Sequence, residues 1–444
     1  MDDSTSPKPR SGRETLQPEL QHQILLQAAT PEDLFSLIRA SPRLYQVFLL
    51  DKRRILCRVA RHQFHPAVLP EIFTLVSLSE IEHPLCREAV IKYCQNDFAE
   101  IRSWQETDLT ISQSATLCRL GGNLRFFIKD YAQSTLPLAK AQIQSQDFHI
   151  TACSGSEGAI RLSELSDSEA GRLQRAFCRF EIYRYLFVRH LRKPHRPASS
   201  SMWYSNFSAR EQAICYLEKL PDFQIAEIHC VRDYLARRLY GIFQRLENRA
   251  VTLISPGRAS GIHLYSISGK SFLCEHVEHL LSLGLPHLRR VYEARGDAQE
   301  ALFMPGTDQH KKLKHSQSLF LSRALESVDP SISLEQRNIP DLLLSAEADH
   351  LDNLNTPAGW RWAYLPGLVY WPEGPHYKGL RDRGYVFWDY NRLLEIGILE
   401  RNAVDVGKTA FQEKSLILEP SVEQRLLDKY KIKAQNRLAG GAAR

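Results

Sequence analysis

Residues Leu16–Phe48 read LQPELQHQILLQAATPEDLFSLIRASPRLYQVF, and this stretch indicates a small helical unit. Its apolar residues recur at the spacing of an amphipathic helix. Thr30-Pro31 and Ser41-Pro42 each combine a side-chain N-cap with a proline in the first helical turn. The pattern therefore predicts three short helices, the third of which starts near Ser41-Pro42 and continues through Ile55 and Val59.

The order of these residues resembles the F-box. It is more closely similar to the F-box-like segment of large families of uncharacterised fungal proteins, in which a Leu-x-Pro-Glu-Leu start precedes Asp-Leu-x-x-Leu-Ile-Arg-Ala-Ser-Pro. Two positions depart from the F-box pattern, because Gln17 replaces its first proline and Leu44-Tyr45 replaces its common tryptophan. The matching positions are Leu16, Pro18, Glu19, Leu20, Ile24, Leu34, Leu37, Ile38, Leu44 and Tyr45.

The resemblance implies a function that depends on partners rather than on chemistry. In the F-box family, these helices dock on the Skp-type adaptor of cullin–RING ubiquitin ligases, and the rest of the chain recruits a protein target. By this resemblance we expect a substrate-recruiting subunit that is not an enzyme, with apolar anchors exposed on the first and third helices. The expected adaptor-binding residues are Leu16, Pro18, Leu20, Ile24, Leu34, Leu37 and Leu44.

Three other functions remain open at this level: a helical scaffold without ligase association, a nucleic-acid-binding protein, and an enzyme whose site is assembled from distant residues. The second rests on Arg172–Arg196, where eight Lys and Arg stand against Glu181 alone, among several aromatic residues. Aromatic side chains among arginines can stack on bases. A simpler interpretation is that the aromatic residues form a buried stripe while the arginines extend to solvent, and under this interpretation nucleic-acid binding is not expected.

The remaining chain predicts a mainly α-helical protein in two parts. Residues 14–64 form the F-box-like unit, and residues 65–435 form a larger, irregular, all-helical domain. Within that domain, Ser166–Glu169 and Ser208–Glu211 are capping boxes, which mark helix starts. Residues 1–13 and 436–444 contain too few apolar residues to offset chain entropy, and we expect flexible tails there.

An aromatic segment rich in Gly and Pro, residues 357–400, closes the helical domain. It contains four of the six tryptophans, which are Trp360, Trp362, Trp371 and Trp388. Its Gly and Pro content argues against regular helices over the tryptophans, so these side chains need another surface to bury against. We therefore expect the segment to pack into the main core rather than to fold alone.

Composition and cysteine spacing restrict the class of protein. The formal net charge is +6, from 57 Lys and Arg against 51 Asp and Glu, which excludes a histone-like polycation. The nine cysteines include no Cys-x-x-Cys pair, so neither a zinc ribbon nor a disulfide framework is indicated. Together with a start that does not resemble a secretory signal, this predicts an intracellular protein of the cytoplasm or nucleus. No apolar run reaches the length of a membrane span, and no membrane association is expected.

Motifs of catalysis or metal binding are incomplete. Gly269-Lys270-Ser271 lacks the glycine that a phosphate-binding loop has five residues earlier, where Leu264 stands, and a surface turn is the better interpretation. His276 and His279 would share a helix face, but no matching Cys/His cluster completes four ligands, so a solvated helix face is expected. Gly-x-Ser-x-Gly does not occur around Ser156. No catalytic residue, metal ligand or cofactor is predicted.

Overall fold

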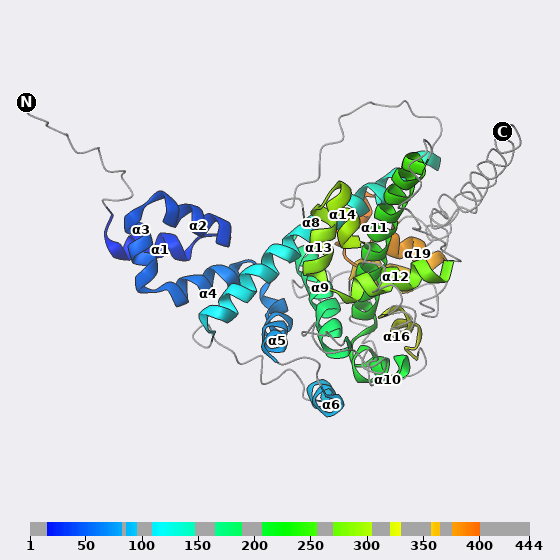
Figure 1. Ribbon diagram of the computed structural model, residues 1–444, viewed down its shortest axis with the longest axis horizontal. Coiled ribbons are helices and arrows are strands. Elements are labelled where there is room, and N and C mark those ends of the chain that lie inside the picture. The colour runs from blue at the N-terminus through cyan, green and yellow to red at the C-terminus, as the bar shows by residue number, and fades with distance from the viewer. Residues whose placement is uncertain are drawn as a thin grey trace, which may run out of the picture.

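The computed structural model describes residues 16–81, 86–95, 109–146, 165–188, 207–254, 270–303, 320–329, 357–364 and 375–399. Every regular element within these ranges is a helix, which confirms the expected mainly α-helical class. Figure 1 shows two parts: a small group of helices at the N-terminal end and a larger body. The first half of the long helix α8 (Ile111–Gln146) connects them. Both expected tails lie outside the described residues.

The N-terminal unit consists of α1 (Pro18–Leu26), α2 (Pro31–Ala40), α3 (Pro42–Leu50) and α4 (Lys52–His62). The two expected caps form, because the hydroxyl of Thr30 accepts from the Asp33 N–H at 3.1 Å and that of Ser41 accepts from the Leu44 N–H at 3.3 Å. Each cap satisfies a backbone donor that the first turn leaves unpaired, and the following proline needs no such partner. Local chemistry therefore sets these two helix starts.

The expectation of one continuous third helix is wrong, because the chain breaks at Asp51. Asp51 has φ −135° and ψ 40°, which is outside the helical region, so α3 ends and α4 starts in a new direction. Its carboxylate lies 2.9 Å from the Nε2 atom of His22 on α1. The break lets α4 turn back over α1 and α2, both of which it contacts.

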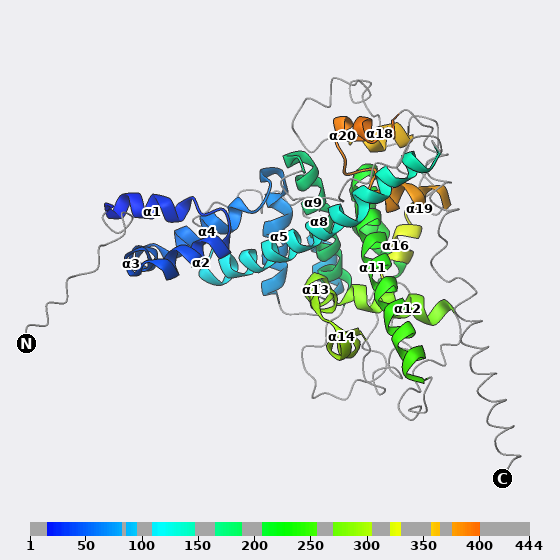
Figure 2. The ribbon, with the colours of Figure 1, turned by 90° about the horizontal axis from the view of Figure 1, so that it is seen from above.

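Helix α4 belongs to two hydrophobic cores. The small core of the N-terminal unit contains Ile55, Leu56 and Val59 of α4. The other residues of this core are Leu25, Leu26, Ala28, Leu34, Leu44, Val47 and Phe48. Cys57 and Ala60 of the same helix belong to the core of the body, because α4 also packs along α8. In Figures 1 and 2, helices α1 to α3 stand away from the body, and α4 with the start of α8 joins the two parts.

The body extends from η1 to α20. Its N-terminal elements are η1 (Pro66–Val68), α5 (Leu69–Glu80), α6 (Arg87–Gln95), α8 and α9 (Asp167–Phe187). Its middle elements are α10 (Ala209–Cys215), η5 (Leu217–Lys219), α11 (Asp222–Ile254), α12 (Lys270–Ser282), α13 (Leu285–Glu293) and α14 (Gly296–Phe303). The last described helices are α16 (Ser322–Glu326), α18 (Ala358–Tyr364), α19 (Pro375–Asp382) and α20 (Tyr390–Glu395). Helix α9 is central, since it packs against α5, α8 and α11.

The two helix starts that the sequence predicts in the body are confirmed. Both capping boxes form, one at Ser166 with Glu169 and one at Ser208 with Glu211. Gly284 ends the α12 segment with a φ of +82°, a conformation that favours glycine.

The C-terminal aromatic segment packs into the body core, as expected, wherever the structure describes it. Trp388 is fully buried, and its neighbour Phe387 lies with its ring centroid 5.2 Å from that of Tyr131 on α8. The expectation of irregular backbone is wrong for Trp360 and Trp362, since both lie on helix α18. Because α18, α19 and α20 are short, each depends on the surface beneath it rather than on helix propensity alone. Trp371 lies outside the described residues.

Candidate functional site

An exposed apolar surface on α1, α2 and α3 is the candidate partner-binding site. Its five large side chains are 46% to 86% exposed; they are Leu20, Phe35, Tyr45, Leu49 and Leu50, hereafter the apolar surface. Single exposed apolar residues are normal on proteins, but five on three short helices are a local concentration that a partner could cover. The described remainder of the chain, which is several times longer, has only five more side chains of this kind.

The structure separates the expected adaptor-binding residues into three groups. Pro18 and Leu20 of α1 are exposed, as anchors must be. Leu16, Ile24 and Leu37 are half-buried, and Leu37 packs against the small core. Leu34 and Leu44 are 0% and 2% exposed, so their expected role as partner contacts is corrected: they hold α2 and α3 together inside the unit.

The sequence pattern missed Phe35, Leu49 and Leu50. Phe35 follows Leu34 directly, and neighbouring residues on a helix point about 100° apart, so only one of the two can face the core. Leu49 and Leu50 precede the break at Asp51. A prediction of one continuous helix does not indicate that α3 ends here, and so it does not indicate that these two side chains are exposed. The signal that could have found them is the apolar run Val47–Leu50, which is too long for one buried helix face.

The arginine-rich helix α9 is a structural element rather than an open basic surface. Its four arginines are buried and each pairs with a carboxylate: Arg172 with Asp389, Arg175 with Glu227, Arg179 with Glu71, and Arg184 with Glu181. The expectation that these arginines extend to solvent is therefore wrong. Their guanidinium groups are neutralised inside the body and do not present positive charge to phosphates.

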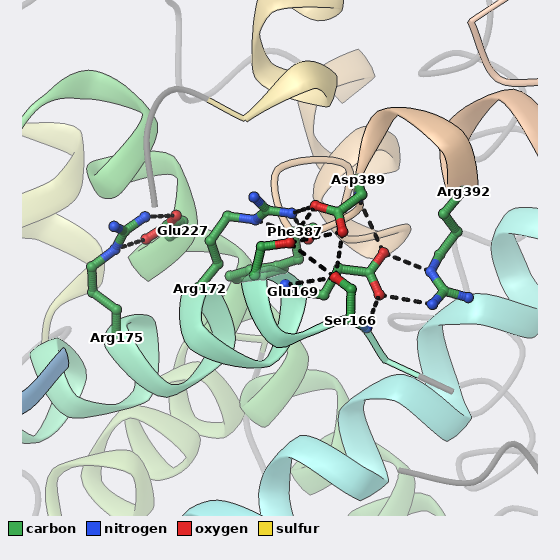
Figure 3. A network of polar contacts seen from close by, with 9 residues as sticks. Ser166, Glu169, Arg172, Arg175, Glu227, Phe387, Asp389 and Arg392 are labelled. Atoms are coloured by element: carbon green, nitrogen blue, oxygen red, sulfur yellow. Dashed lines mark hydrogen bonds and ion pairs between the residues drawn. The ribbon is translucent and has the colours of Figure 1, made fainter. Parts of the chain in front are cut away.

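A polar network at the N-terminus of α9 binds the aromatic segment to the rest of the body (Figure 3). The Ser168 hydroxyl donates to the Asp389 carboxylate at 2.8 Å, and the Ser166 hydroxyl donates to the same carboxylate. Arg172 donates through Nε and Nη2 to the carbonyl of Phe387, at 3.1 and 2.9 Å, and also to Asp389. Serine and arginine side chains of α9 therefore hold the residues that lead into α20.

Glu169 and Arg392 complete the network from opposite helices. Arg392 on α20 donates to both carboxylate oxygens of Glu169, at 2.6 and 2.8 Å, and the Asp389 N–H donates to Glu169 at 3.1 Å. Burial alone would raise the pKa of Asp389, but Arg172 and the two serine hydroxyls hold that pKa below its usual value. The donors and acceptors of this network pair with one another, which is typical of a contact that holds two helices together rather than of a catalytic centre. We call this network the clamp.

A second buried polar cluster joins α11 to α12 and α19. Asp233 of α11 accepts from Arg381 at 2.6 Å and from Arg232 at 2.9 Å, and Arg232 also pairs with Glu278 of α12. Burial, with the nearby Arg381 charge, lowers the pKa of His229 to about 3, so that imidazole is neutral near pH 7. A base with so low a pKa is poorly matched to proton transfer near neutral pH.

The expected solvated pair of histidines on α12 is corrected. His276 is buried, and its Nε2 atom lies 2.8 Å from the Phe303 carbonyl oxygen. Burial lowers the pKa of His279 to about 4. Among the described residues, no group of three His, Cys, Asp or Glu side chains is arranged to hold a metal ion. Gly269 lies outside the described residues, and Lys270 begins α12.

Comparison of the chain with protein-family models, with curated proteins and with solved structures found no match in any of the three. Within the described part of the chain, no helix combines the length and the apolar character that crossing a membrane requires. The candidate site is therefore argued from its own side chains and their exposure.

Proposed function

We propose that the N-terminal unit docks a Skp-type adaptor protein, and that the body presents a protein target to the ubiquitin ligase which the adaptor joins. The observation that carries this proposal is the apolar surface of α1, α2 and α3. It lies on the segment whose residue order resembles the F-box, and on helices that stand away from the body (Figures 1 and 2).

The chemistry of the apolar surface fits a protein partner. Leu20, Tyr45 and Leu50 are exposed on α1 and α3, and Leu50 is 86% exposed. Burying such side chains in an interface contributes about 25 cal/mol per Å² of apolar area removed from water. Tyrosine is among the commonest hot spots of protein interfaces, and a helix that docks in a groove uses apolar side chains as anchors. The helices beneath them keep their own core, so partner binding does not require the unit to unfold.

Direct binding of the purified chain to a purified Skp-type adaptor tests the proposal. Leu20→Asp places a charge in the expected interface, and we expect the dissociation constant to rise by about tenfold or more. Ile214→Asp is the matched control, because Ile214 on α10 of the body is 48% exposed, close to the 51% of Leu20. Calorimetric titration should show normal binding for the control, with equal melting temperatures for both variants.

Two results would overturn the proposal. The first is a folded wild-type chain that does not bind the adaptor at protein concentrations near 100 µM, at which even a weak interface with a binding free energy of about 5.5 kcal/mol would be detected. The second is equal loss of binding for Leu20→Asp and Ile214→Asp, which would mean that the contact is unspecific. Affinity purification from the native organism would add the cullin and the target to the same measurement.

A further inference from the structure

The positive charge of the chain is concentrated next to the apolar surface. Residues 39–62 contain seven Lys and Arg and one Asp, a formal charge of +6 that equals the net charge of the whole chain. All other residues together are therefore balanced. The seven are Arg39, Arg43, Lys52, Arg53, Arg54, Arg58 and Arg61. Such a local excess attracts anionic partners even though the protein as a whole is only mildly basic.

Helix α4 presents most of this charge on its outer side. Ile55, Leu56, Val59 and Ala60 face the two cores, whereas Lys52, Arg53, Arg54 and Arg58 are exposed. Arg54 and Arg58 are four residues apart, so they lie one above the other on the same helix face. No acidic residue occurs in α4, and α8, which packs along it, adds the exposed Arg119 and has no acidic residue before Lys129.

Two of these arginines contribute to the packing of the chain. Arg53 donates to the Leu109 carbonyl at 2.6 Å, and Arg61 lies with its guanidinium carbon 5.8 Å from the Phe73 ring centroid. Lys52 and Arg54 are exposed in the first turn of α4. Elsewhere, the arginines of α9 are buried against carboxylates. The cations on the outer face of α4 are exposed to solvent, whereas the arginines of α9 are buried in the body.

We propose that the outer face of α4, which we call the basic face and define by Lys52, Arg54 and Arg58, docks an acidic protein segment that also carries apolar side chains. The apolar requirement comes from Leu49 and Leu50, which end α3 directly before α4 and are 52% and 86% exposed. Carboxylates of the partner would meet Arg54 and Arg58, and its apolar side chains would cover Leu50. Leu49 and Leu50 also belong to the apolar surface, so a bound acidic segment would share these two side chains with a partner docked there.

A protein segment fits this surface better than a nucleic acid does. Proteins that bind single strands stack bases on aromatic side chains, and α4 carries no Phe, Tyr or Trp in its sequence KRRILCRVARH. A phosphate backbone would leave Leu49 and Leu50 in water, whereas an acidic and apolar peptide buries them. Arginine is suited to bidentate contact with carboxylates, and three of the four exposed cations of α4 are arginines.

Selection of a random 12-residue peptide library on the full chain tests the proposal. We expect the recovered peptides to be enriched in Asp and Glu together with Leu or aromatic residues. Lys52→Glu/Arg54→Glu should weaken the best peptide by about tenfold or more, because two attractions become repulsions. Arg290→Glu/Arg323→Glu is the matched control, since it makes the same change of net charge at exposed positions on α13 and α16.

Two further measurements separate the chemical contributions. Affinity for the selected peptide should fall as salt rises from 50 to 500 mM, because exposed charges are screened. Leu50→Ser should weaken the peptide by several-fold while leaving its salt dependence unchanged. Circular dichroism of each variant confirms that the helices are intact.

Three outcomes would overturn the proposal: recovered peptides without an acidic bias, equal binding by Lys52→Glu/Arg54→Glu and wild type, or equal losses in the charge-reversed variant and its control. A labelled 20-base-pair DNA duplex or a 20-nucleotide RNA that binds more tightly than the selected peptide, and loses binding with Lys52→Glu/Arg54→Glu, would assign the basic face to nucleic acid instead. Adaptor binding by Leu20→Asp and by Lys52→Glu/Arg54→Glu, each measured beside wild type, separates the two proposals, because neither variant changes Leu50.

Discussion

Leu34 and Leu20 both belong to the F-box-like pattern, but the structure gives them different roles. Leu34 is fully buried and Leu20 is 51% exposed. We expect Leu34→Ala to lower the free energy of unfolding of the N-terminal unit by about 2–5 kcal/mol, because it leaves a cavity in a small core. Leu20→Ala should change it by less than about 0.5 kcal/mol. Urea unfolding followed by circular dichroism checks both, and equal effects would contradict the assignment of core and surface.

Alanine substitutions at Gly384 and Gly122 should change the stability of the body in opposite directions. Gly384 has φ +65°, and a Cβ atom there would lie 2.6 Å from the Tyr131 hydroxyl oxygen, so Gly384→Ala should destabilise the body by more than about 1 kcal/mol. Gly122 lies inside α8, where a Cβ atom would meet Arg289 at an ordinary 3.6 Å. Gly122→Ala should therefore stabilise by up to about 1 kcal/mol. Melting temperatures that move the same way in both variants would contradict this packing.

At the scale of elements, the clamp between α9 and α20 should make stability depend on pH. The folded pKa of Asp389 is lower than its unfolded value, so its contribution is present above the unfolded pKa and is lost as pH falls through the folded pKa. Asp389→Asn removes the charge that faces Arg172. We expect it to cost about 1–3 kcal/mol near pH 7, because a buried guanidinium loses a charged partner.

The measurement is urea unfolding of wild type and Asp389→Asn at several pH values between 7 and 3. The difference between the two proteins should shrink as pH falls below the unfolded pKa of an aspartate, about 3.9. Glu293→Gln is a suitable control, because Glu293 pairs with Arg289 on the exposed side of α13, where an ion pair contributes little. A pH-independent difference for Asp389→Asn would contradict the clamp.

Helix starts were predictable from the sequence because their causes lie within four residues. Thr30, Ser41, Ser166 and Ser208 each cap a helix through the backbone N–H three positions ahead. The break at Asp51 was not predictable, since Leu44 to Val59 keeps helical spacing across it. Its cause is the packing of α4 against α1, α2 and α8, which the local pattern does not encode.

The pairing of the arginines in α9 could not be inferred from sequence. Arg172 and Asp389 are separated by 217 residues, and their contact exists only after the aromatic segment has packed on α9. A run of positive charge looks the same whether its partners are phosphates in solution or carboxylates from a distant helix. The candidate site was predicted in part, because the F-box-like pattern located the unit and Leu20 but not the exposure of Phe35, Leu49 and Leu50.

At the scale of the whole molecule, α4 joins the N-terminal unit to the body, because its residues belong to the hydrophobic cores of both. The expected boundary near residue 64 follows the end of α4, yet Cys57 and Ala60 already belong to the body core. A partner held on α1, α2 and α3 is therefore connected to the body through a helix whose buried residues belong to both cores. Such a connection would keep a docked adaptor at a fixed distance from a target held by the body.

The two cores should differ in their local stability. The small core is formed by a few residues of α1 to α4, whereas the body core unites aromatic side chains from α8, α9, α11 and the C-terminal segment. A larger folded unit buries a larger fraction of its surface and is more stable. The free energy of the opening that exposes amides to hydrogen exchange should therefore be lower in α1, α2 and α3 than in α9 and α11.

Hydrogen exchange followed by mass spectrometry tests this difference and connects it to function. Peptides from residues 18–50 should exchange faster than peptides from 170–187, and saturating Skp-type adaptor should slow exchange in the first group alone, because a ligand stabilises the state that it binds. Leu20→Asp should remove the adaptor's effect and leave exchange in the body unchanged. If both regions exchange at one rate, the molecule opens as a single cooperative unit. In that case α4 couples the two cores so strongly that partner binding would slow hydrogen exchange in the body as well as in α1, α2 and α3.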